Sequence, residues 1–111
     1  MAEVSERIRE HFKSAFGLSD AAAQGLLGTS RAALRAGLAA LGEAIGNGDS
    51  EGVSHWAHSI KGNLLNSGLP ELAEIALSME VSATRGRACE RELRGAHGRL
   101  EASLASFLRA D

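Results

Sequence analysis

Apolar residues recur at intervals of three and four along almost the whole chain, and this spacing places them on one face of an α-helix. The helical stretches are separated by short breaks that contain glycine. One stretch, for example, places Val53, Ala57, Ile60 and Leu64 in a continuous apolar stripe. The expected helices cover residues 3–16, 20–27, about 30–45, about 50–67, 70–84 and about 88–107.

Residues that favour helix ends stand at these boundaries. Gly17 follows the first helix as a C-terminal cap would. Pro70 suits the first position of a helix, and it disfavours the helical conformation at Leu69 before it. The side chains that can cap the helices in between are Thr29 or Ser30 and Asp49 or Ser50.

The composition points to the same class of fold. The chain has 20 alanines and 15 leucines but only nine β-branched residues, a bias that favours helix over strand. Its 111 residues are typical of one domain. We therefore expect a single all-α domain over residues 1–111, an antiparallel four-helix bundle with additional N-terminal helices that cap one end.

Charge and cysteine content exclude several classes of protein. With 14 acidic and 12 basic residues, the chain lacks the basic character of a nucleic-acid-binding domain. No stretch longer than ten residues is without a charged side chain, so we expect no membrane span and no signal peptide, and a soluble cytoplasmic protein. Cys89 stands alone, which excludes an internal disulfide and a cysteine-built zinc site. We expect no metal and no cofactor.

The helix over residues 50–67 carries the candidate chemistry. His58 lies roughly 130° around the helix from the centre of the apolar stripe, so it should face water. Lys61 and Gly62 follow at three and four residues, on the same surface. A glycine inside a helix costs about 1 kcal/mol relative to alanine, and Gly62 comes too early to be a cap. The simplest reason for it is that a side chain there would block a bulky partner from reaching His58.

Further residues extend this surface. Leu65 falls within about 20° of the direction of His58, so an apolar side chain should lie exposed two turns further along. We therefore expect a partner-docking surface that includes Gly62 and Leu65. His55, one turn before His58, either lines the same surface or is simply a solvated histidine.

Residues 58–68, HSIKGNLLNSG, resemble the signature of histidine-containing phosphotransfer (HPt) domains, which reads roughly H-x-L-K-G-S-A-x-x-x-G. The sequence departs from it at Asn63 and Leu64, where the family usually has small residues, and at Ser67, which is usually apolar. These departures concern partner preference more than chemistry. The matching positions are His58, Ile60, Lys61, Gly62 and Gly68.

The segment that follows also resembles the family, in Leu72, Ala73, Ala76 and the pair Met79 and Glu80. The resemblance implies that His58 is the phosphorylated histidine and that Glu80 hydrogen-bonds its imidazole. Such a carboxylate would fix the tautomer and stabilise the charge that develops on the ring. Lys61 would partly neutralise the phosphoryl oxygens.

The resemblance also implies the partners. The chain has no phosphate-cradling glycine loop and no pair of metal-binding carboxylates, so no ATP site is expected. The protein would be a phosphocarrier without kinase activity of its own, and we expect a monomer. Its partners would be response-regulator receiver domains, which bring their own Mg²⁺, and a hybrid sensor histidine kinase.

Three alternatives remain open at this point. Glu51, His55 and His58 lie at spacings that can share one helix face and bind a metal, although di-iron bundles need two Glu-x-x-His motifs. A non-catalytic adaptor or dimerisation bundle would use the exposed apolar surface only to bind a protein. The chain could also be one domain of a larger hybrid or chemotaxis-type kinase, although its short termini favour a free-standing carrier.

Overall fold

The computed structural model describes residues 3–87 and 89–109, and the regular structure in these residues is entirely α-helical. This confirms the all-α class. The predicted start of the last helix at about Ala88 lies outside the described residues. The helices are α1 (Val4–Phe16), α2 (Asp20–Gly46), α3 (Ser50–Asn66), α4 (Pro70–Thr84) and α5 (Glu90–Arg109).

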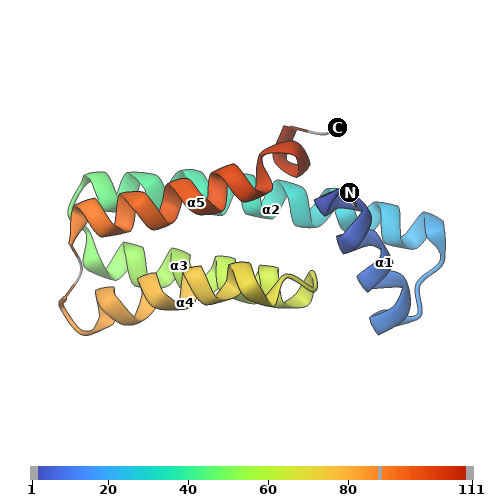
Figure 1. Cartoon of the computed structure of the whole chain (residues 1–111), viewed down its shortest axis with the longest axis horizontal. Coiled ribbons are helices and arrows are strands. Elements are labelled where there is room, and N and C mark those ends of the chain that lie inside the picture. The colour runs from blue at the N-terminus through green and yellow to red at the C-terminus, as the bar shows by residue number, and fades with distance from the viewer. Residues whose placement is uncertain (1–2, 88, 110–111) are drawn as a thin grey trace.

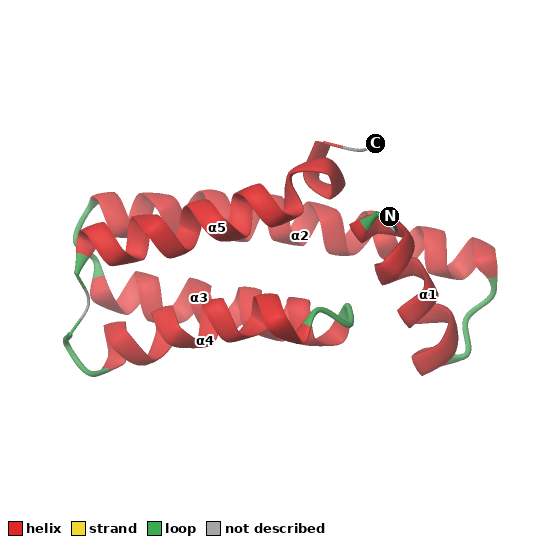
Figure 2. Ribbon diagram, viewed as in Figure 1, coloured by secondary structure: helices red, strands yellow, loops and turns green. Residues whose placement is uncertain are grey.

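The helices α2 to α5 lie alongside one another, with the pair α2 and α5 stacked on the pair α3 and α4 (Figure 1). Helix α3 packs against both α2 and α4, and α5 packs mainly against α2. The N-terminal part of α2 extends beyond the ends of α3 and α4, and α1 folds back against this extension (Figure 2). The apolar faces of all five helices form one core. Its fully buried members include Ile60, Leu64, Met79, Leu100 and Leu104.

The structure corrects the prediction for residues 20–45. They form one continuous helix of 27 residues, α2, rather than a short helix followed by a longer one. The N-cap is Ser19, whose hydroxyl accepts a hydrogen bond from the backbone of Ala22 at 3.2 Å. The Thr29 hydroxyl donates to the Gly25 carbonyl within the helix at 3.3 Å, so it does not begin a new one. A single helix, α1, therefore precedes α2 where two were expected.

Ser30, the other proposed cap, belongs to a small polar cluster between α2 and α3. Its hydroxyl donates to the side-chain oxygen of Asn63 at 2.8 Å. The Ser67 hydroxyl donates to the same oxygen at 3.2 Å, and the Asn63 amide reaches the Ser30 carbonyl at 3.4 Å. Asn63 and Ser67 are two of the positions that depart from the family signature. Their polar groups satisfy one another here, so the departures are accommodated by the contact with α2.

The connection between α3 and α4 is tight and determines which side chains of the two helices meet. Gly68 has a φ of 77°, a left-handed conformation that glycine adopts without strain, and Pro70 stands at the start of α4 as predicted. Helix α1 covers this turn: Arg7 forms an ion pair with Glu71 and donates a hydrogen bond to the Gly68 carbonyl at 3.2 Å. A side chain at Gly68 would collide with the ring of His11. Both the backbone conformation and the lack of space therefore require glycine at position 68.

Candidate functional site

The apolar stripe of α3 is buried, and this determines which of its residues face solvent. Val53, Ala57, Ile60 and Leu64 are all at most 2% exposed. His58 lies off this stripe, and its side chain is 68% exposed. Asp49 caps the helix by accepting a hydrogen bond from the backbone of Gly52 at 3.0 Å, one of the two caps proposed from the sequence.

Glu80 of α4 joins two side chains of α3. Its Oε2 lies 2.9 Å from Nδ1 of His58, and its Oε1 accepts a hydrogen bond from Nζ of Lys61 at 2.8 Å. The three side chains expected from the sequence to act together are thus brought together across the α3–α4 interface. Glu80 and Lys61 are each about four-fifths buried, while the imidazole stands in solvent.

The charges around Glu80 determine its protonation state. Lys61 holds the pKa of the Glu80 carboxyl below its usual value, partial burial opposes the shift, and His58 adds to the lowering. Glu80 is therefore ionised at neutral pH. A carboxylate can only accept hydrogen bonds, so Nδ1 of His58 carries the proton that it shares with Glu80. In the neutral imidazole, Nε2 then holds the free lone pair.

Packing within the described structure does not require a glycine at position 62. A Cβ added there would meet no atom within 4 Å, so the bundle itself would tolerate a larger residue. Leu65, on the same helix, is 50% exposed. His55 is also exposed, and its ring stands edge-on to Trp56 with centroids 4.8 Å apart. The surface around His58 is therefore open, apolar at Leu65, and free of bulk at Gly62.

Two apolar residues on α4 beside Glu80 were not predicted from the sequence. Leu77 and Val81 are 36% and 37% exposed, and they line a shallow cleft of about 260 Å³ together with Lys61 and Glu80. The signal in the sequence is weak, because both residues lie off the buried face of α4 but their exposure depends on which neighbouring helices cover it. They extend the apolar part of the surface from α3 onto α4.

The other histidines, all within the described residues, lack the environment of His58. His97 is 84% buried and its Nε2 donates to the Leu38 carbonyl at 2.8 Å, so neither a free nitrogen nor access remains. His11 packs against Gly68 and makes an edge contact with Phe16. His58 is the histidine that combines one fixed ring nitrogen with one exposed.

Neither a metal centre nor a membrane span is found in residues 3–87 and 89–109. No group of three or more histidine, cysteine or acidic side chains is placed there to hold an ion. In particular, Glu51, His55 and His58 do not form such a group. None of the described helices is long and apolar enough to cross a bilayer.

No curated protein and no solved structure matches this chain. The family model described as Hpt domain matches residues 25–110. This range spans most of α2 and all of α3 and α4, and it contains His58, Lys61 and Glu80. The chain therefore belongs to the Hpt domain family, whose members carry out histidine phosphotransfer in two-component signalling.

Proposed function

We propose that this protein is a phosphocarrier that accepts a phosphoryl group on Nε2 of His58 from the aspartyl phosphate of one receiver domain and passes it to another. The observation that carries the proposal is the hydrogen bond between Nδ1 of His58 and Glu80. In the neutral imidazole this bond leaves the lone pair on the other ring nitrogen, where a nucleophile requires it. We further propose that α2 to α5 form the four-helix phosphotransfer unit of a single domain, with α1 as a cap over one end.

The transfer is a displacement at phosphorus. The Nε2 lone pair forms the new N–P bond as the bond from phosphorus to the aspartyl oxygen breaks, and the aspartate leaves as a carboxylate. The proton on Nδ1 stays in place, so positive charge develops on the ring. Glu80 stabilises that charge at a fixed distance, and positions the ring for in-line attack. In the reverse direction the same contacts serve an imidazole that is leaving.

Lys61 supplies the positive charge of the site. Its ammonium group is already held by Glu80, one helical turn from His58. In the phosphorylated protein it interacts with the phosphoryl oxygens as a mobile point charge, which stabilises them without the rigid two-pronged grip of an arginine. That suits a group that must be released again. The receiver contributes Mg²⁺ and its own carboxylates, so this chain provides half of the reacting site.

The docking surface is proposed to comprise Gly62, Leu65 and His55 on α3, extended by Leu77 and Val81 on α4. Gly62 lets the receiver backbone approach His58, and the apolar residues supply contact area. The partners are receiver domains and the receiver of a hybrid sensor kinase, each bound by a monomer. A carrier must release each partner, so the interface should be small, below roughly 1,200 Å² in total.

The experiment that tests the proposal is incubation with a phosphorylated receiver domain. The protein should acquire an acid-labile, base-stable phosphoryl group, and mass spectrometry of the peptides should place it on His58. His58→Gln should lose the label completely while circular dichroism shows unchanged helix content. Label that persists in His58→Gln would refute the site. Receiver binding without any label in the natural protein would favour an adaptor function.

A further inference from the structure

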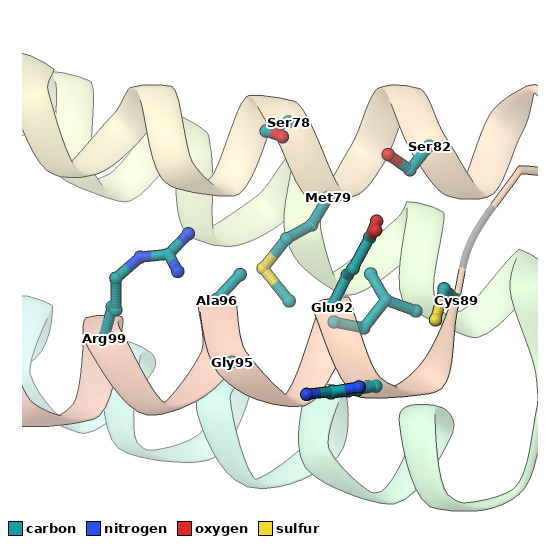
Figure 3. Close-up of a pocket in the computed structure, with 10 residues that line it drawn as sticks. Ser78, Met79, Ser82, Cys89, Glu92, Gly95, Ala96 and Arg99 are labelled. Atoms are coloured by element: carbon teal, nitrogen blue, oxygen red, sulfur yellow. The ribbon is translucent and has the colours of Figure 1, made fainter.

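A second cleft, of about 580 Å³, lies between α4 and α5. It is present because the residues that face each other across this interface are small: Ser78 and Ser82 on α4, and Gly95 and Ala96 on α5 (Figure 3). A Cβ added at Gly95 would meet no atom within 4 Å. The helices therefore leave a space here that no side chain of the described chain fills.

Three charged residues, Arg91, Glu92 and Arg99, line this cleft. Arg99 and Glu92 lie seven residues apart on α5, so they share one face and are separated by about 10 Å along the helix axis. Figure 3 shows both side chains rising from α5 toward α4 on either side of Ala96. Within the described residues, neither side chain takes part in an ion pair or a hydrogen bond. Each is thus free to interact with a ligand.

The remaining walls of the cleft divide into an apolar and a polar part. Met79 and Leu93 form its apolar floor, at 2% and 7% exposure. The hydroxyls of Ser78 and Ser82 lie on the α4 side, at positions that form one row along the helix. The volume lies within the roughly 300–1,000 Å³ range of small-molecule sites. The polar groups at the edges of the cleft can fix the orientation of a ligand.

We propose that the α4–α5 cleft binds a phosphomonoester of nucleoside size. The Arg99 guanidinium holds the phosphate through paired N–H donors, the geometry in which arginine recognises phosphate best. The apolar body of the ligand lies over Met79 and Leu93. Glu92 accepts hydrogen bonds from hydroxyl or amino groups at the far end.

This site is distinct from the phosphotransfer site. Ser78 and Ser82 each lie two residues from Glu80, a spacing that turns their side chains about 200° around α4. Glu80 faces α3 and His58, while the serines face α5. The proposal therefore stands or falls independently of the phosphoryl chemistry at His58.

The test is titration of the whole chain with adenosine monophosphate, followed by calorimetry and by amide chemical shifts. We expect saturable binding at one site, with the largest shifts in residues of the cleft. Adenosine, which lacks the phosphate, and inorganic phosphate, which lacks the apolar body, should each bind at least about tenfold more weakly, because each makes only part of the contacts. Inorganic phosphate that binds as tightly as the nucleotide would overturn the assignment of ligand class.

Variants then locate the site. Arg99→Gln should weaken binding about tenfold or more, because a charged hydrogen-bonding partner is lost. Gly95→Leu should also abolish binding by filling the cleft. The matched control is Arg94→Gln, since Arg94 pairs with Glu90 and does not line the cleft. No saturable binding up to millimolar nucleotide, or equal affinity in Arg99→Gln, would refute the proposal.

Discussion

The two sides of α4 differ in whether their charged side chains are paired. On the side that faces α3, both oxygens of Glu80 are engaged, one by His58 and one by Lys61. On the side that faces α5, Arg99 has no partner within the described residues and stands beside open space. Pairing of charged side chains fixes their geometry, as catalysis requires. An unpaired charged side chain beside a cavity leaves room for a ligand. The short α3–α4 turn brings about the first arrangement, and small residues between α4 and α5 allow the second.

The sharpest way to separate the two sides uses two glycines that both face open space. Gly62→Gln should block measurable transfer from a receiver, because the side chain occupies the approach to His58. Gly95→Gln, on the other side, should leave transfer unchanged. Both variants should be slightly more stable to heat, since glycine is the poorer helix former by up to about 1 kcal/mol. Transfer kinetics and thermal unfolding of both proteins provide the measurement.

Two outcomes of this pair of variants would contradict the separation of the two sides of α4. Normal transfer in Gly62→Gln would show that the glycine does not serve access. A loss of transfer in Gly95→Gln would show that the two sides of α4 are not independent.

The variant Glu80→Gln removes the charge that pairs with His58 and Lys61 on the α3 side of α4. The glutamine keeps an oxygen that can accept the Nδ1 proton but loses the negative charge, and neutral hydrogen bonds are roughly half as strong as charged ones. We expect transfer to become about tenfold slower, which corresponds to about 1.4 kcal/mol in the transition state. The label should remain on His58. Single-turnover transfer at saturating receiver measures this, and an unchanged rate would mean that Glu80 serves only to hold Lys61.

A smaller effect is expected for the docking surface. Leu65→Ala should weaken receiver binding by about 1 kcal/mol, as expected when an exposed apolar contact residue is truncated. The melting temperature should barely change, because half of the side chain is already in solvent. Calorimetric titration with the receiver, alongside thermal unfolding, distinguishes the two roles. A large loss of stability with unchanged affinity would instead place Leu65 in the core.

The smallest effect concerns pH. The pKa of Glu80 is lowered in the folded protein, mainly by Lys61. The pairing therefore stabilises the fold fully above pH 4.5, the ordinary value, and this contribution is lost as the pH falls through the lower, folded-state pKa. Lys61→Met should return the pKa toward its ordinary value. Carboxyl titration by NMR reports it directly, and an unchanged pKa in that variant would assign the shift to His58 instead.

Much of the fold could be predicted because local rules govern most helix ends. Pro70 begins α4, Asp49 caps α3, and Gly17 ends α1 in a left-handed conformation with a φ of 66°. The prediction failed between Leu27 and Ser30, because hydroxyl residues suit both a cap and a tertiary contact. Only the packing of α3 against α2 decides that Ser30 points at Asn63 rather than at its own backbone.

For the candidate site, the spacing of His58, Lys61 and Gly62 along one helix could be predicted from periodicity alone. The position of Glu80 opposite them came from the family resemblance, and the distances establish the contact. Leu77 and Val81 were missed because exposure on α4 depends on which neighbours cover it. The α4–α5 cleft could not be predicted at all, since the separation between two helices depends on the packing of every layer between them.

The hydrogen-bonded group of Ser30, Asn63 and Ser67 has a consequence for the alignment of the helices. Apolar side chains pack almost equally well after a helix slides by one turn, so an apolar interface alone tolerates alternative registers. A slide of α3 along α2 would separate Ser30 from Asn63 and Ser67, which move together with α3, and leave the Ser30 hydroxyl, in a residue only 7% exposed, without its partners. An unsatisfied buried hydroxyl costs about 1–3 kcal/mol. The group therefore fixes the register of α3 against α2. It thereby sets the position of His58 along the bundle axis, and with it the position at which any receiver must dock.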